Sequence, residues 1–210
     1  MSITHHLDEA TLMSFAAGSL PSTFAAVAAA HVAMCSRCRR DAAALERVGG
    51  ALMAALPPAG LDRREPVPPV APPAGLRAAA VEPDGEMPRA IANLVGCSLD
   101  DVPWRWLGPG VWEHILPSTG NAKLRLLKVA PRRNVPEHGH GGPELTLVLR
   151  GSFHDETGRY VRGDVSELDE TVDHQPVSDA GGDCICLIAS EQPEQFHGFA
   201  ARQWQRLRGF

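Results

Sequence analysis

A proline-rich stretch near the middle of the sequence divides the chain into two parts. Residues 57–88 contain nine prolines, at positions 57, 58, 66, 68, 69, 72, 73, 83 and 88. Because proline fixes φ and lacks a backbone N–H donor, such a segment favours an extended, partly polyproline II conformation over a helix or a sheet. The sequence therefore predicts a helical domain over residues 1–57 and a β domain over residues 101–210, joined by a linker over residues 58–100.

The first part of the chain has the apolar spacing of short helices. We expect three of them, over residues 8–17, 21–34 and 36–56. Within the linker, one further short helix could form over Gly75–Val81 and another from Pro88 to Val95. Three short helices with a small core are marginally stable on their own, so a bound metal would supply much of the missing stability.

An imidazole and two thiols lie close together where the second and third predicted helices meet. On a helix, His31 and Cys35 lie one turn apart on one face, and Cys38 follows three residues later. These are three of the four ligands that a tetrahedral zinc needs, and the nearest candidates for the fourth are His5 and His6. The alternative interpretation is a buried histidine beside two reduced cysteines in a helical core. The spacing favours a structural zinc site.

The composition argues against several classes of function. The formal net charge is −5 and no segment has the basic excess that phosphate backbones require, so direct nucleic-acid binding is not expected. We find no apolar run long enough to span a bilayer and no signal-like N-terminus, which predicts a cytoplasmic protein without a membrane partner. In that compartment the five cysteines indicate metal or thiol chemistry instead of a disulfide framework.

From Trp104 onwards the sequence has the pattern of short strands. Apolar runs and alternating segments recur, and Gly-containing turns separate them. Eight or more such strands within about 100 residues predict a sandwich or a barrel. The fold class is therefore α + β, with a small zinc-stabilised helical bundle followed by a β-barrel.

A second group of candidate ligands lies between two of the predicted strands. On a strand, His138 and His140 point to the same side, and Glu144 has the same parity. His174 follows roughly 30 residues later and could complete the set from a neighbouring strand. Imidazoles with a carboxylate suit zinc or another divalent metal such as Fe, Mn, Ni or Cu. The alternative is a set of polar side chains on a solvent-facing loop at the barrel rim.

Other reactive side chains carry weaker signals. Cys184 and Cys186 point the same way on a predicted strand, where a disulfide between them would be strained. Two buried thiols are therefore favoured over a redox pair. We interpret Asp155-Glu156 as a turn, Cys97 as structural, and the remaining histidines as ordinary polar residues, namely His114, His154 and His197. No catalytic residue and no organic cofactor site is predicted.

Two segments resemble the motifs of a known fold. The pattern His138-x-His140-x3-Glu144, followed by Gly151, resembles the first cupin motif, and Gly163 to His174 resembles the second. The sequence departs from the family at Arg132, where a glycine is usual, and the second segment lacks the internal Pro-x-Gly. The resemblance implies a small jelly-roll barrel that holds a metal through four side chains, those of His138, His140, Glu144 and His174.

The chain as a whole is similar to the ChrR-type zinc-binding anti-sigma factors. The resemblance rests on a His-x3-Cys-x2-Cys helical module followed by a cupin, and on four further segments: His5-His6, Gly49-Gly50, Glu144–Leu149 and Asp183–Leu187. It implies a first zinc bound by His6, His31, Cys35 and Cys38. It also implies that the zinc domain sequesters an extracytoplasmic-function sigma factor. The metal-binding cupin domain would release this partner on oxidative stress, such as singlet oxygen, or on binding a small-molecule signal.

A second hypothesis is a metal-dependent cupin enzyme with a structural zinc domain. An open metal position beside three histidines and a glutamate could bind oxygen or an enol, as in a dioxygenase or an isomerase. The sequence offers no separate general base or substrate-binding cluster, so we expect a regulator and not an enzyme.

Overall fold

The structure is a computed structural model that describes residues 2–58, 87–118, 122–192 and 195–196. Most of the proline-rich stretch, the helix expected over Gly75–Val81, and His197 lie outside these residues. Among the described helices, none combines the length and the apolar character that crossing a bilayer requires.

Four helices match the expected positions. They are α1 (Glu9–Ala16), α2 (Ser22–Met34), α3 (Ser36–Ala55) and α4 (Arg89–Val95). Asp8 caps α1 by accepting a hydrogen bond from the Thr11 amide at 2.6 Å, and Gly96 ends α4 in the left-handed region with φ +79°. Between α2 and α3, Cys35 alone is extended, so one residue ends the first helix and begins the second.

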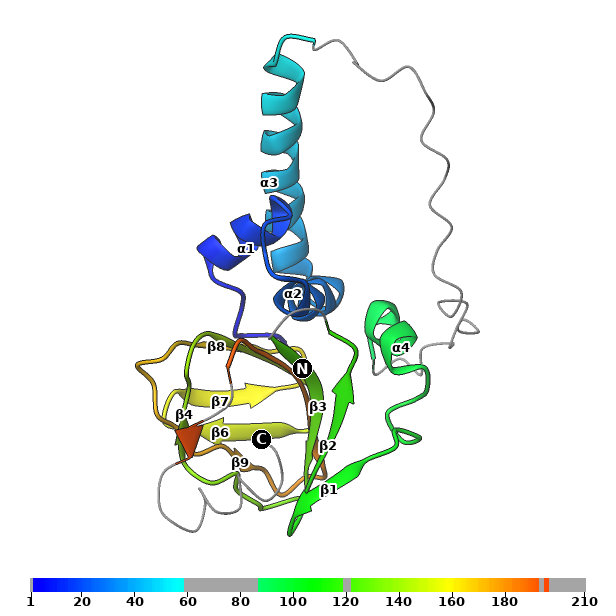
Figure 1. The fold of residues 1–210 in the computed structure, drawn as a ribbon, viewed down its shortest axis with the longest axis vertical. Helices are drawn as coiled ribbons and strands as arrows, with labels where there is room; N and C mark the ends of the chain where they lie inside the picture. The colour runs from blue at the N-terminus through cyan, green and yellow to red at the C-terminus, as the bar shows by residue number, and fades with distance from the viewer. Residues whose placement is uncertain (1, 59–86, 119–121, 193–194, 197–210) are drawn as a thin grey trace.

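The β part is a sandwich, which confirms the α + β fold class. Its large sheet has the antiparallel order β1-β2-β3-β10-β5-β8 and faces two small sheets, β7-β6-β9 and β11-β4 (Figure 1). The strands are β1 (Arg105–Gly108), β2 (Val111–Leu116), β3 (Lys123–Val129), β4 (His138–Gly139), β5 (Glu144–Arg150), β6 (Ser152–Asp155), β7 (Gly158–Val161), β8 (Val165–Leu168), β9 (Val177–Ser178), β10 (Cys184–Ser190) and β11 (Gln195–Phe196).

The central strands β5 and β10 of the large sheet are buried on both faces. Toward the small sheets, Cys186 and Ile188 of β10 pack with Phe153 of β6. The alternate residues of the same strand, such as Leu187, point outward and share a core with Val27 of α2. Figure 1 shows α2 lying across this outer face, where it contacts β5 and β10. The helices and the sheet are therefore held together by one hydrophobic core, while the domain boundaries at residues 57 and 100 stay predictions.

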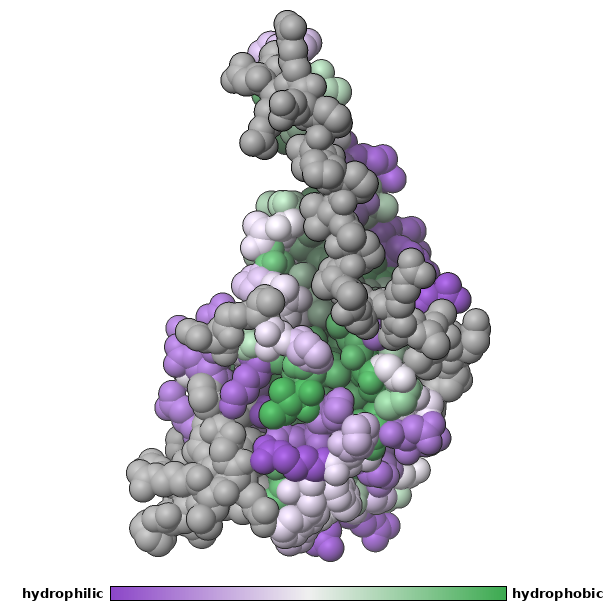
Figure 2. All heavy atoms as spheres, turned by 45° about the vertical axis from the view of Figure 1, so that its right-hand side comes forward, coloured by the Kyte–Doolittle hydropathy of each residue, from purple (hydrophilic) through white to green (hydrophobic). Residues whose placement is uncertain are grey.

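α3 extends away from the rest of the described molecule. Its first half packs against α1 and α2, and its second half projects outward (Figure 1). It continues without interruption through Gly49-Gly50. Hydrophobic side chains also form a patch on the face that Figure 2 shows. This patch lies between the helices above and the polar surface of the β part below.

Two candidate metal centres

The first cluster lies where the N-terminal segment meets the α2–α3 junction. The ligand atoms of His6, His31, Cys35 and Cys38 all lie within 4.8 Å of one another. Three nitrogen–sulfur distances are 3.3 Å (His31 Nε2 to Cys38 Sγ), 3.3 Å (His6 Nδ1 to Cys35 Sγ) and 3.7 Å (His6 Nδ1 to Cys38 Sγ). Zn–N and Zn–S bonds at a tetrahedral angle put these atoms about 3.5 Å apart, so the cluster has the size of a zinc site.

The structure distinguishes between the two neighbouring histidines. His6 points into the cluster. His5 instead packs on the ring of Tyr160, with centroids 4.4 Å apart, and its Nδ1 lies 3.4 Å from a carboxylate oxygen of Asp164. His6 is thus the fourth member of the set, although its binding of a metal stays a prediction.

The surroundings of the first cluster favour a cation. His31 is fully buried, and its Nδ1–H donates to the Gly163 carbonyl at 2.9 Å, which leaves Nε2 free to bind a metal. Burial lowers the pKa of His31 to about 4, so the ring is neutral at pH 7. Burial raises the pKa of the Cys38 thiol to about 11, and a thiolate at this place therefore requires a positive partner.

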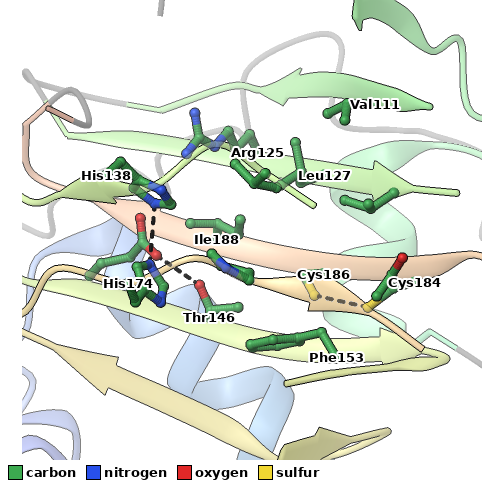
Figure 3. A pocket seen from close by; sticks show the side chains of 15 residues that line it. Val111, Arg125, Leu127, His138, Thr146, Phe153, His174, Cys184, Cys186 and Ile188 are labelled. Atoms are coloured by element: carbon green, nitrogen blue, oxygen red, sulfur yellow. Dashed lines mark hydrogen bonds between the residues drawn. The ribbon is translucent and has the colours of Figure 1, made fainter. Parts of the chain in front are cut away.

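The second cluster consists of three buried histidines in the β part. His138 lies on β4, His140 follows it, and His174 lies opposite in a loop that forms an isolated bridge with His138. The Nε2 atom of His174 is 3.2 Å from the Nε2 atoms of both other rings. Figure 3 shows His138 and His174 at one end of a cavity.

Hydrogen bonds on the far sides of two rings fix their tautomers. The Nδ1–H of His138 donates to the Pro136 carbonyl at 2.9 Å, and that of His174 donates to Asp155 at 2.8 Å. Both rings therefore turn an unprotonated Nε2 toward the same point. Lone pairs that converge in a buried site repel each other unless a cation lies between them, so the donor set fits a divalent metal.

Glu144 lies beside the three histidines but outside the group that converges. Its Oε1 accepts from the Thr146 hydroxyl at 3.0 Å, and its Oε2 is 3.6 Å from Nδ1 of His140. This Oε2 is buried and has no hydrogen-bond partner among the described residues. An orphaned carboxylate oxygen at this place is consistent with a cation site, and the role of Glu144 as a ligand stays a prediction.

Asp155 holds one of the candidate ligands, His174, a contact that the sequence did not predict. Its side chain is completely buried, and it accepts hydrogen bonds from His174 and from the Thr157 amide at 2.8 Å. Burial opposes ionisation, but the bonds from His174 and Thr157 hold the pKa of Asp155 below its usual range. The turn expected at Asp155-Glu156 is present, and it also orients a candidate metal ligand. The sequence around Asp155 does not distinguish a residue that only forms a turn from one that also orients a metal ligand.

Two thiols line the cavity next to the second cluster. The Sγ atoms of Cys184 and Cys186 are 3.7 Å apart, and both residues face the same cavity as His138 and His174 (Figure 3). The neighbouring Cys184 thiol and burial raise the pKa of Cys186 well above its usual range, so it is a neutral thiol. The expected pair of buried thiols is therefore present, whereas a redox pair was the less favoured alternative. The wall between thiols and histidines is mainly apolar, with the buried guanidinium of Arg125 among its polar groups.

Other singled-out residues lie away from both clusters. His154 pairs with Asp179, with 3.2 Å between Nδ1 and Oδ1, and Cys97 packs partly buried against the main core. His114 lies on β2, outside both groups of candidate ligands.

The buried histidines predict a pH dependence of the metal-free protein. Burial lowers the pKa of His31 and of His138 to about 4, whereas an unfolded histidine titrates near 6.5. The unfolded state thus binds more protons between these values, and stability falls as the pH is lowered through this window. Between pH 6.5 and about pH 5, we expect each histidine to reduce the free energy of unfolding by roughly 1.5 kcal/mol.

Urea unfolding in the presence of a chelator at several pH values measures this effect. The same titration with metal added is the control, because a bound cation keeps the rings neutral. Equal stability of the chelated protein at pH 7 and at about pH 5 would contradict the expectation.

The fold and the two clusters together define the class of protein to which this chain belongs. The molecule is a cupin protein with a helical N-terminal part, and it contains His and Cys groups that could bind metal. Residues 93–193 match the ChrR Cupin-like domain. The chain is 43% identical over 211 residues to the anti-sigma-E factor ChrR of Cereibacter sphaeroides, covering 95% of each chain. It is also similar to the ChrR chain in the crystal structure of Rhodobacter sphaeroides SigE in complex with the anti-sigma ChrR, with a TM-score of 0.77 and 41% identity, covering 90% of this chain and 100% of that one. The chain belongs to the ChrR family.

Proposed function

We propose that this chain is an anti-sigma factor that sequesters an extracytoplasmic-function sigma factor through its helical part. A relative of nearly the same length is named as an anti-sigma factor, and a similar solved structure is its complex with SigE. Both comparisons extend over the helical and the β parts, so they support the function for the whole chain. The role is regulatory and not enzymatic, and the complex would form in the cytoplasm.

The observation that carries this proposal is an exposed apolar stripe on the projecting half of α3. Residues spaced for one side of the helix are largely exposed: Val48 (58%), Leu52 (67%), Met53 (70%) and Leu56 (61%). An apolar helical face that the described residues leave exposed is typical of helix-mediated protein recognition. The stripe lies at the far end of α3, which projects away from the other described elements (Figure 1).

We further propose the identity of the metals. Two histidines and two cysteines of tetrahedral size favour a structural zinc at His6, His31, Cys35 and Cys38. Three imidazoles next to Glu144 favour zinc or another divalent metal in the cupin part. Residues 1–57 would then act as a zinc domain and residues 101–210 as a cupin domain.

The cupin part would control release of the sigma factor. A signal such as an oxidant changes sigma binding only if it has different affinities for the bound and the free states. The core shared by α2 and the outer face of the large sheet provides a physical connection between the two parts. We propose that oxidative stress, such as singlet oxygen, acts on the cupin part and lowers the affinity of the helical part for sigma.

Changing Leu52 to aspartate tests the docking surface. A charge in the middle of the apolar stripe would lose its hydration in the complex, so we expect the affinity for the extracytoplasmic-function sigma factor to fall at least about 100-fold. Co-purification and a titration by calorimetry measure the effect. The matched control is Ala54→Asp, which places the same charge in the same turn on the opposite face of α3.

Two outcomes would contradict the proposal. Failure of the zinc-loaded wild type to co-purify with the sigma factor argues against the anti-sigma function itself. Equal effects of Leu52→Asp and Ala54→Asp argue against this face of α3 as the contact.

A further inference from the structure

The turn between β7 and β8 of the cupin part reaches the first cluster from outside. The Gly163 carbonyl accepts the Nδ1–H of His31 at 2.9 Å. The next residue, Asp164, has a completely buried side chain. Its Oδ1 accepts hydrogen bonds from the amides of Thr4 (2.7 Å) and His5 (3.0 Å). One turn of the cupin part therefore contacts one cluster residue directly and holds the backbone immediately before another, His6.

The backbone of this turn is shaped for the contact. Gly163 has φ +93°, a conformation that L side chains rarely adopt. A Cβ atom there would lie 2.7 Å from side-chain carbons of Ile3 and 3.6 Å from Cε of Met34. The turn thus packs directly against the N-terminal segment and the end of α2, with no room for a side chain between them.

Asp164 could either stabilise the β7–β8 turn alone or also hold the N-terminal segment, and its hydrogen bonds distinguish the two roles. As an ordinary turn residue it needs only Oδ2, which accepts the Val161 amide at 2.9 Å within the β7–β8 turn. Oδ1 does not serve the turn, because its two donors come from residues 159 and 160 positions away in the sequence. A third contact, from the Val165 amide to the His5 carbonyl at 3.4 Å, continues this pairing. Oδ1 therefore serves only to attach the N-terminal segment to the cupin part, and Oδ2 also lies 3.4 Å from Nδ1 of His5.

We propose that the β7–β8 turn is the outer shell of the first metal cluster, with Asp164 as its positioning residue. This rests on the proposed zinc site. The turn fixes the tautomer of His31 and holds residues 4 and 5 so that the His6 ring is already placed for the metal. Such outer-shell partners change metal affinity by about 10- to 100-fold in other sites.

The arrangement makes zinc binding and domain docking dependent on each other. Because this outer shell belongs to the cupin part, separation of the helices from the sheet weakens zinc binding. By reciprocity, loss of zinc weakens the docking of the helical part on the cupin part by the same factor. A signal that displaces the β7–β8 turn would therefore act on the zinc domain without touching a zinc ligand.

The test is Asp164→Asn in the full-length protein. In asparagine, either the NH2 group faces the Thr4 and His5 amides, or a neutral amide oxygen takes the place of the carboxylate oxygen that accepts from them. The bonds that hold residues 4 and 5 are therefore lost or weakened in both orientations. We expect zinc affinity at the first cluster, measured by competition with a chromophoric chelator, to fall about 10-fold or more. Cobalt substitution identifies the site, because its charge-transfer band requires thiolate ligands, and the second cluster consists of histidines.

The matched control is Asp179→Asn. Asp179 also accepts several hydrogen bonds, from Ser152, His154 and Arg159, but it lies away from the N-terminal segment. We expect the zinc affinity of the Asp179→Asn variant to stay within about twofold of that of the wild type. Hydrogen exchange gives an independent readout, since the Thr4 and His5 amides should lose protection in Asp164→Asn alone.

The outcomes are distinguishable. Equal zinc affinity of Asp164→Asn and the wild type would overturn the inference while leaving the zinc site intact. A wild type without the cobalt–thiolate band would overturn the zinc site itself, and the inference with it. If Asp164→Asn does not fold, Thr4→Pro decides, because proline at position 4 has no N–H to donate to Asp164 Oδ1 and leaves the β7–β8 turn unchanged. A loss of zinc affinity of a few-fold supports the inference, and an unchanged affinity contradicts it.

Discussion

Replacing Cys35 with serine is expected to remove one of two metal equivalents and to abolish sigma binding. The thiolate is a strong zinc ligand and a neutral hydroxyl is not, so the first cluster would keep three of its four donors. Structural zinc sites contribute about 10–16 kcal/mol of apparent binding free energy to folding, far more than a small helical core supplies. Serine can still cap α3, as Cys35 does by accepting the Cys38 amide, so the expected loss comes from the metal bond and not from the helix cap.

Metal analysis of the purified variant and co-purification with the sigma factor measure both effects. Cys97→Ser is the matched control, because Cys97 is partly buried but belongs to neither cluster, and this variant should keep both metals and the partner. A Cys35→Ser protein with full metal content and wild-type sigma binding would rule out a structural zinc at this position.

Replacing His174 with alanine is expected to uncouple the signal from sigma binding. His174 Nε2 lies 3.2 Å from both other histidines of the second cluster, so its removal leaves two imidazoles and a carboxylate that no longer surround a common point. We expect loss of the second metal equivalent, unchanged sigma affinity, and no release of sigma on exposure to singlet oxygen. The first cluster is built from other elements and should keep its zinc.

His154→Ala is the control for this experiment. His154 also pairs with a carboxylate, that of Asp179, but it lies outside the cluster, so the variant should respond to oxidant as the wild type does. Normal release of sigma by a His174→Ala protein that has lost its second metal would show that the response does not pass through this centre.

The sequence by itself determined the local geometry of both clusters. His31 lies in the last turn of α2, four residues before Cys35, which ends that helix, and His138 and His140 are two apart on an extended segment. Such spacings follow from the fixed rise and twist of a helix or strand, so they can be deduced without the fold. For the same reason the helices and the β class were predictable from the period of the apolar residues and from the positions of proline and glycine.

Only the tertiary structure decided which distant residues complete each centre. It placed His6, and not His5, in the first cluster. In the second cluster it placed the Glu144 carboxylate next to the three histidines but outside the group whose ligand atoms converge. It also placed Asp155 behind His174 and Asp164 behind the N-terminal segment. These partners are brought together by the packing of α2 on the sheet and by turns whose local pattern does not differ from that of any Asp-containing turn. A hydrogen bond between residues far apart in the chain depends on the whole core, and no short segment encodes it.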